Sequence, residues 1–190
     1  IGETTGFVSA PVHASISGKV VALGNFPHSM GSDLPAVVIE SDGKDEWVPG
    51  LKENADYTLL SPDELKKIVL EAGIVGMGGA TFPTHVKLGP PKEKPIDVVI
   101  LNGAECEPYL TSDHRLMLER PQQIVDGLKI LMRILGVKKG YIGIEANKPD
   151  AVETMTKAAA GSPEIKVWPV KVKYPQGAEK MLIKALLGRE

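Results

Sequence analysis

A cluster of glycines between residues 73 and 79 is the part of this sequence best suited to holding a phosphate group. It is followed by Phe82 and Pro83, and then by Thr84 and Lys87. Glycines let the backbone approach a ligand closely and turn its N–H groups toward it, while the threonine hydroxyl and the lysine ammonium would add a hydrogen bond and a positive charge. The alternative interpretation is a tight connection between two packed elements, without a ligand.

The glycine cluster does not match either of the two common phosphate-binding motifs. A dinucleotide-binding fingerprint follows a strand, whereas Leu65–Ala72 has the pattern of a helix. The Gly-Lys-Ser or Gly-Lys-Thr ending of a P-loop does not occur in the sequence. The segment is therefore neither an ordinary Rossmann turn nor a P-loop.

Two further groups of polar residues each follow a run of apolar, strand-like residues. Asn102 and Glu105 come after the run at residues 96–101, and Tyr174 follows the run at residues 165–172. In sheets of parallel strands, ligands bind beyond the carboxyl ends of the strands. We therefore expect both groups, together with the glycine cluster, to converge on one crevice.

The pattern of the chain from residue 61 onward predicts an α/β domain over residues 61–190. Ser61-Pro62-Asp63-Glu64 is typical of a helix start. Strands are expected at residues 96–101, 137–144 and 165–172, and helices at residues 65–72, 113–120, 121–135, 149–159 and 177–187. Strands that alternate with helices of this length favour a mostly parallel, Rossmann-like sheet with flanking helices.

Residues 1–60 are rich in Gly, Pro, Ser and Val and predict a small all-β module. Short strands are expected at Phe7–Val8, Gly18–Leu23, Ala36–Glu40 and Trp47–Val48. The segment Pro11–Val20 is similar to half of a lipoyl-carrier barrel, which implies a partial barrel or sandwich that is truncated at its N-terminus. It lacks the lysine that such carriers need at the hairpin tip, so we expect no attached prosthetic group.

The composition argues against several classes of protein. The 190 residues are 43% hydrophobic and carry a formal net charge of −2, which suits a core of ordinary size and disfavours nucleic acid as the main partner. No apolar run reaches the roughly 18 residues of a membrane-spanning helix. The single Cys106 can form no internal disulfide and cannot by itself hold an iron–sulfur cluster, which needs four thiolates. No metal site is expected in these residues.

Three blocks of the sequence resemble the NADH-binding flavoprotein subunit of respiratory complex I and its relatives. The flavin-binding loop of that family, Gly-x-x-Gly-Arg-Gly-Gly-Ala-Gly-Phe-Pro-Thr-Gly-x-Lys, is matched at Gly73, Gly76, Gly78, Gly79, Ala80, Phe82, Pro83, Thr84 and Lys87. The second block, Asn102–Pro108, resembles Asn-Ala-Asp-Glu-Gly-Glu-Pro, and the third, Tyr174–Glu179, resembles Tyr-x-x-Gly-Glu-Glu. Three blocks in the same order are much more specific than one loop.

The residues chosen within these blocks, together with the opening segment Gly6–Val20, resemble RnfC, the peripheral subunit of Rnf ferredoxin:NAD oxidoreductase complexes. The resemblance covers essentially all 190 residues. A cobalamin reductase of bacterial microcompartments is built on the same plan and is the alternative. RnfC-like chains carry cysteine-rich iron–sulfur modules beyond the flavin domain. We therefore expect this chain to be a fragment, with 4Fe-4S clusters in a C-terminal part outside this sequence.

The resemblance implies binding of FMN and NAD(H) without a catalytic side chain, because the cofactor carries the hydride chemistry. Gly76, Gly78 and Gly79 would let the backbone approach the cofactor, and Lys87 would balance charge near its phosphate or ring. The other residues that the resemblance assigns to cofactor binding are Phe82, Asn102, Glu105, Glu107, Tyr174, Gly177 and Glu179.

Individual roles follow from the same resemblance. Phe82 would stack on a nucleotide ring, with plain core packing as the alternative. Asn102 would hydrogen-bond the flavin ribityl chain or ring edge, and Glu105 and Glu107 would bind flavin and nucleotide hydroxyls. Tyr174 would help to wall in the flavin.

The sequence also departs from the complex I pattern. Ala104 and Ala178 stand where that pattern has acidic residues, and Thr81 and His85 replace glycines. These departures concern NADH binding more than the flavin pocket, and they allow a non-catalytic docking subunit as an alternative. The expected partners are the other subunits of the Rnf complex, NADH and, indirectly, ferredoxin. The membrane would be reached only through partner subunits, at the cytoplasmic face of the cell membrane.

Overall fold

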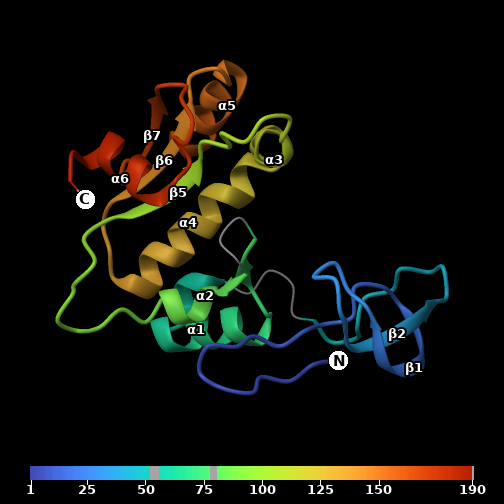
Figure 1. Ribbon diagram of the computed structural model, residues 1–190. Coiled ribbons are helices and arrows are strands. Elements are labelled where there is room, and N and C mark those ends of the chain that lie inside the picture. The colour runs from blue at the N-terminus through green and yellow to red at the C-terminus, as the bar shows by residue number, and fades with distance from the viewer. Residues whose placement is uncertain (52–55, 78–80, 190) are drawn as a thin grey trace. The chain divides into compact units, whose positions relative to one another are not determined.

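The structure is a computed structural model that describes residues 1–51, 56–77 and 81–189. The chain divides into two compact units, which Figure 1 shows with their elements coloured along the sequence. The first unit comprises Ile1–Leu60 and Lys67–Lys87, and the second unit comprises Ser61–Lys66 and Leu88–Glu190. The glycine-rich segment therefore belongs to the first unit, and the polar groups that follow the strands belong to the second.

The first unit contains a long antiparallel hairpin of β1 (Gly18–Pro27) and β2 (Asp33–Ser41). These two strands confirm two of the four that the sequence predicts in this region. The predictions at Phe7–Val8 and Trp47–Val48 are wrong, because Phe7 lies in a bend and Trp47 lies outside any helix or strand, and both residues are largely exposed. An apolar pair alone is too short to specify a strand, which also needs a neighbouring ladder of hydrogen bonds.

Helix α1 (Pro62–Glu71) begins as its sequence predicts, with a capping box. The Ser61 backbone N–H and hydroxyl donate to the Glu64 carboxylate at 2.8 and 2.6 Å, and the Glu64 N–H donates to the Ser61 hydroxyl at 3.3 Å. The helix ends at Glu71, and Gly73, with a φ of 67°, closes a Schellman-type turn after it. A Cβ on Gly73 would lie 2.5 Å from the Pro11 carbonyl oxygen, so this glycine is required by chain packing.

Replacing Ser61 with alanine is expected to lower the free energy of unfolding by about 1 kcal/mol at neutral pH, because the helix loses its side-chain cap. The hydrogen bonds from Ser61 lower the pKa of Glu64. A carboxyl with a lowered folded-state pKa adds stability above its unfolded pKa, and this stability is lost as the pH falls through the folded pKa. Urea unfolding at pH 7 and pH 3 should therefore show a smaller difference in acid. Equal differences at both pH values would contradict the capping-box role.

The rest of the first unit is short. A 3₁₀ helix, η1 (Tyr57–Leu59), precedes the junction with α1. After α1, strands β3 (Val75–Gly76) and β4 (Phe82–Pro83) form a small antiparallel hairpin, and helix α2 (Thr84–Lys87) follows at once. The described part of the glycine-rich segment therefore lies between α1 and α2.

The second unit is an α/β layer structure built on a parallel sheet. Its strands are β5 (Val99–Gly103), β6 (Gly140–Glu145) and β7 (Ile165–Val170), in that spatial order. Its helices are α3 (Ser112–Glu119), α4 (Pro121–Leu135), α5 (Pro149–Ala159) and α6 (Glu179–Leu187). This architecture confirms the predicted Rossmann-like fold, and α4 and α5 have the predicted bounds.

The two faces of the sheet have separate cores, because side chains alternate along β6. Ile142 and Ile144 pack with α3, α4 and α5 in a cluster centred on Leu128 and Met155. The opposite face packs against α6 through Val170, Leu182 and Leu186 (Figure 1). Both cores hold β5, β6 and β7 in register, so the three carboxyl ends lie at one edge of the sheet.

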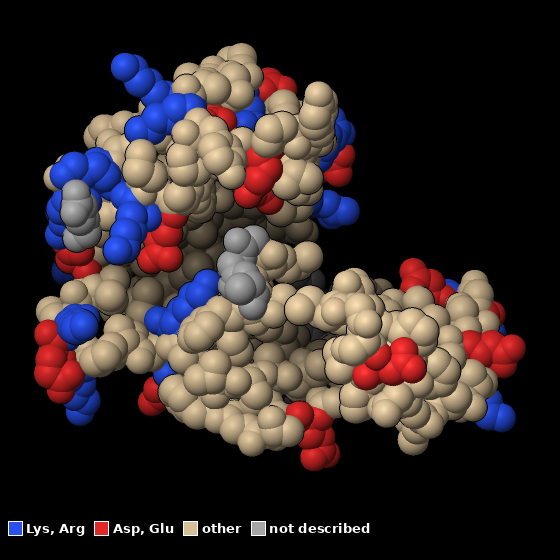
Figure 2. All heavy atoms as spheres, viewed as in Figure 1, with Lys and Arg blue, Asp and Glu red and all other residues tan. Residues whose placement is uncertain are grey.

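Three further findings concern the surface, the helices and the ionisable side chains. Side chains of both charge signs are spread over the face shown in Figure 2. Among the residues that the structure describes, no helix combines the length and the apolar character that crossing a membrane requires. Over the same residues, no group of three or more His, Cys, Asp or Glu side chains is arranged to hold a metal ion.

Candidate functional site

The glycine-rich segment forms the small hairpin of β3 and β4. Gly76 pairs with Phe82, and the Thr81 N–H donates to the Gly76 carbonyl at 3.0 Å. Two of the predicted phosphate-contacting residues, Gly78 and Gly79, lie outside the described residues. The hairpin therefore places Gly76 at the base of the predicted loop.

Phe82 and Lys87 interact with each other in the first unit. The Lys87 ammonium lies over the Phe82 ring, 5.9 Å from its centroid, in a cation–π contact. The Phe82 side chain is 40% exposed and Lys87 is exposed, so neither belongs to a packed core. Plain core packing is thus an incomplete account of Phe82, and stacking on a ligand stays a prediction.

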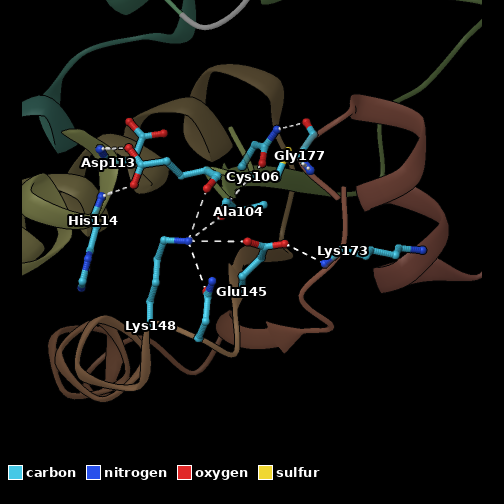
Figure 3. A network of polar contacts seen from close by, with 11 residues as sticks. Ala104, Cys106, Asp113, His114, Glu145, Lys148, Lys173 and Gly177 are labelled. Atoms are coloured by element: carbon cyan, nitrogen blue, oxygen red, sulfur yellow. Dashed lines mark hydrogen bonds and ion pairs between the residues drawn. The ribbon is translucent and has the colours of Figure 1, made fainter. Parts of the chain in front are cut away.

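The second and third blocks meet at the carboxyl edge of the sheet (Figure 3). The Asn102 side-chain N–H donates to the Gly177 carbonyl at 2.6 Å, and its Oδ1 accepts from the Ala104 N–H at 3.3 Å. The Gly177 N–H in turn donates to the Cys106 Sγ at 3.2 Å. Residues 75 positions apart are therefore joined directly, as the parallel-sheet argument predicts for these two blocks. The glycine-rich segment belongs to the other unit, and its convergence with them stays a prediction.

Glu105 is tied to the N-terminus of α3. Its carboxylate accepts from the backbone N–H groups of Asp113 at 2.7 Å and His114 at 3.0 Å, and from the Ser112 hydroxyl at 3.2 Å. The N-cap residue Thr111 makes no side-chain cap of its own, so Glu105 supplies the cap from a distance. These bonds hold Glu105 at a φ of 45°, which is uncommon for a non-glycine residue. The structure thus shows a local role for Glu105, beside which its role in flavin binding stays a prediction.

The remaining predicted binding residues of the second unit have accessible side chains or backbone. Glu107 follows Cys106 on the surface, Tyr174 is 75% exposed, and Glu179 is exposed in the first turn of α6. Gly177 is only partly buried, between Cys106 and Asn102. All four are therefore open to a ligand at this edge of the sheet.

A buried ion pair lies behind these segments, and none of the sequence motifs pointed to it. Lys148, at the start of α5, and Glu145, the last residue of β6, are 7% and 2% exposed, with their charged atoms 3.6 Å apart. Figure 3 shows the Lys148 ammonium at the centre of several contacts. A glutamate that ends an apolar strand, with a lysine three residues later, is the pattern that could have revealed it.

Several carboxyl groups lie near the carboxyl edge of the sheet, and their surroundings shift the pKa of two of them. Removal from water, together with the charges of Glu105 and Glu107, raises the pKa of Asp113, and the charge of Lys148 partly opposes this rise. Farther out, the His114 ring lies 2.9 Å from the Asp150 carboxylate, and this hydrogen bond lowers the pKa of Asp150. The pKa values of Asp113 and Asp150 are therefore shifted in opposite directions.

The third block packs closely on the second. Gln176 is 1% exposed, and among the described residues its side-chain oxygen has no hydrogen-bond partner, which is rare for a buried acceptor. Next to it, a Cβ on Gly177 would lie 3.1 Å from the Cys106 Sγ, so a glycine is needed for this close approach of the two blocks.

Two known protein families match different parts of the chain. Residues 69–190 match the family described as the Nuo51 FMN-binding domain, and residues 1–44 match the RnfC Barrel sandwich hybrid domain. The first match includes the glycine-rich segment and both polar blocks of the second unit. The second match agrees with the predicted partial barrel or sandwich.

The similar curated proteins are components of ion-translocating complexes. The chain is 54% identical, over its whole length, to a component of the Na⁺-translocating ferredoxin:NAD⁺ oxidoreductase complex of Acetobacterium woodii, and spans 43% of that protein. It is 56% identical, again over its whole length, to the counterpart from the proton-translocating complex of Clostridium ljungdahlii, and spans 41% of it. The chain thus spans less than half of these relatives.

The fold is shared with a solved structure. The NAD⁺-reducing [NiFe]-hydrogenase in its H₂-reduced state aligns with 68% of this chain and 24% of its own, at 24% identity and a TM-score of 0.57. This likeness concerns the fold alone. From the match over residues 69–190, the chain belongs to the Nuo51 FMN-binding domain family, and its resemblance to RnfC is confirmed over its whole length.

Proposed function

We propose that this chain is the FMN- and NAD(H)-binding module of a membrane-associated, ion-translocating ferredoxin:NAD oxidoreductase complex. The observation that carries the proposal is the direct hydrogen bond between Asn102 and Gly177. It brings together two of the family's three blocks at the edge of the sheet where α/β proteins bind ligands. The membership of residues 69–190 in an FMN-binding family supports the same assignment.

Each predicted residue has a distinct task in this proposal. Lys87 supplies a mobile positive charge, and Gly76 leaves the backbone accessible, while Phe82 offers an exposed aromatic face. In the second unit, Asn102 and Gly177 fix the backbone that borders the cofactor. Glu107, Tyr174 and Glu179 present accessible side chains for the flavin or the nucleotide, and Glu105 acts through the cap of α3.

The wider role follows from the chemistry of the cofactor. When bound, FMN would supply the conversion between a two-electron hydride from a nicotinamide and the single electrons that iron–sulfur centres carry. We infer that the 4Fe-4S clusters belong to parts of the protein outside these residues, and that the other subunits and, through them, ferredoxin are the partners. The complex would hold this module at the cytoplasmic face of the membrane through those subunits.

FMN retention tests the proposal. The purified protein, incubated with FMN and desalted, should keep visible flavin absorption that NADH bleaches under anaerobic conditions. Lys87→Ala should weaken FMN binding about ten- to a hundredfold, since a hydrogen bond to a charged group contributes about 1.5–3 kcal/mol. Lys67→Ala is the matched control, because Lys67 is an exposed lysine of the same unit that pairs with Glu71 in the next turn.

The possible outcomes separate the alternatives. Flavin that is retained and bleached by NADH supports the redox module. Flavin that is retained but inert to NADH would support the flavin site and reject NADH binding, in line with the departures at Ala104 and Ala178. A protein that binds neither would favour the non-catalytic docking subunit.

A further inference from the structure

The Lys148 ammonium holds the second block from behind. It donates to the Ala104 carbonyl at 2.9 Å and lies 3.4 Å from the Glu105 carbonyl. The Asn147 side-chain oxygen is a further acceptor at 3.3 Å. These contacts reach back more than 40 residues from the start of α5 to the chain just after β5, so one side chain fixes the path of the second block.

Glu145 does the same for the chain that leads into the third block. Its Oε1 accepts from the Lys173 backbone N–H at 3.1 Å, and its Oε2 faces the Lys148 ammonium at 3.6 Å. Since β6 lies between β5 and β7, Glu145 stands at the carboxyl end of the central strand, between the two blocks. The pair therefore forms a continuous link from Ala104 and Glu105 to Lys173, as the dashed lines of Figure 3 show.

Burial explains why this link is stiff. A buried charge is tolerated only with a partner and with hydrogen bonds for its remaining atoms, and here each charge has both. Lysine suits the place because its compact ammonium has three donors that can reach acceptors in different directions. On the same helix, Lys157 and Glu153 form an exposed pair, which contributes little and links nothing outside α5.

We infer that Lys148 and Glu145 are positioning residues that set the separation of the second and third blocks and thereby the affinity of the flavin site. This inference rests on the proposed function. Neither side chain needs to touch the cofactor, because the pair acts on the backbone of Ala104, Glu105 and Lys173. The link also keeps Asn102 and Gly177 within hydrogen-bonding distance.

Hydrogen exchange tests the positioning without flavin. In Lys148→Met, the N–H groups of Ala104 and Gly177, which bond Asn102 and Cys106, should lose protection at least tenfold. The N–H of Val99, which donates to the Lys139 carbonyl at the opposite end of the sheet, should keep its protection. An equal loss at all three N–H groups would show only a general destabilisation and would overturn the inference, as would no loss at the first two.

A double substitution separates positioning from stability. Lys148→Met leaves Glu145 charged and buried, whereas Glu145→Met with Lys148→Met removes both charges and should recover much of the thermal stability. FMN affinity should stay about tenfold weaker in both variants, because both lack the Lys148 contact to Ala104, and the double variant also lacks the Glu145 contact to Lys173. Recovery of FMN affinity together with stability would overturn the inference. Lys157→Met is the matched control and should change neither quantity.

The proposed function and the positioning role can fail separately. If the wild-type chain binds no FMN, the proposed function and the flavin part of this inference both fall, whatever the exchange data show. If the wild type binds FMN and Lys148→Met binds it equally well, only the positioning role is overturned.

Discussion

Replacing Leu128 with alanine is expected to lower the free energy of unfolding of the second unit by about 2–5 kcal/mol. Leu128 is fully buried on α4, at the centre of the larger core cluster. It packs where Gly140 of β6 has no side chain, and a Cβ on Gly140 would lie 3.1 Å from a Leu128 methyl carbon. The Met132 sulfur lies still nearer to the same point, at 2.7 Å, and its flexible side chain can fill part of the vacated space, which places the cost near the middle of the range.

Trp168 provides the measurement for Leu128→Ala. It lies on β7 in the second unit, with its ring edge-on to Tyr141 at 5.9 Å between centroids. The other tryptophan, Trp47, belongs to the first unit, so a Trp47→Phe background assigns the fluorescence change to the second unit. Urea unfolding then gives the free energy directly. Leu116→Ala is the control, since Leu116 is 49% exposed, and comparable losses in both variants would contradict the packing argument.

The sequence predicted the second unit well because its signals are local. Pro121 and Pro149 each stand at the first position of a helix, and Gly136 ends α4 in the left-handed conformation that favours glycine. The continuous apolar run that ends at Leu101 identifies β5 as a buried parallel strand. Each of these features depends on a few neighbouring residues, so no knowledge of the tertiary fold is required.

The parts that were missed depend on contacts between distant residues. Glu105 caps a helix that starts seven residues later, whereas its place in a family motif predicts a role in cofactor binding. The burial of Lys148 has no sequence signal of its own, because a lone lysine before a helix is usually solvated. Its role depends on carbonyl groups more than 40 residues away, which only the parallel arrangement of β5 and β6 brings near.

Gly177→Val is expected to abolish retention of FMN, with a loss of affinity of at least about a hundredfold, or roughly 2.8 kcal/mol. A Cβ at this position would lie 3.1 Å from the Cys106 Sγ, 3.7 Å from the Ala104 Cβ and 3.8 Å from the Asn102 Oδ1. The Cβ alone requires a shift of a few tenths of an ångström, and the two further methyl groups of valine require more. Such a shift separates the two blocks that the Asn102 hydrogen bond joins.

A smaller substitution and its rescue make this prediction specific. Gly177→Ala should weaken FMN binding about tenfold in the wild type, because its Cβ meets the Cys106 sulfur. In a Cys106→Ala background the sulfur is gone, and the same substitution should cost much less, so the double-mutant cycle should show a coupling of about 1 kcal/mol. Gly161→Ala is the control, since a Cβ there meets no atom within 4 Å. Equal losses with and without Cys106 would show that the site does not depend on the close approach of the second and third blocks, and the flavin site would then have to be sought elsewhere in the chain.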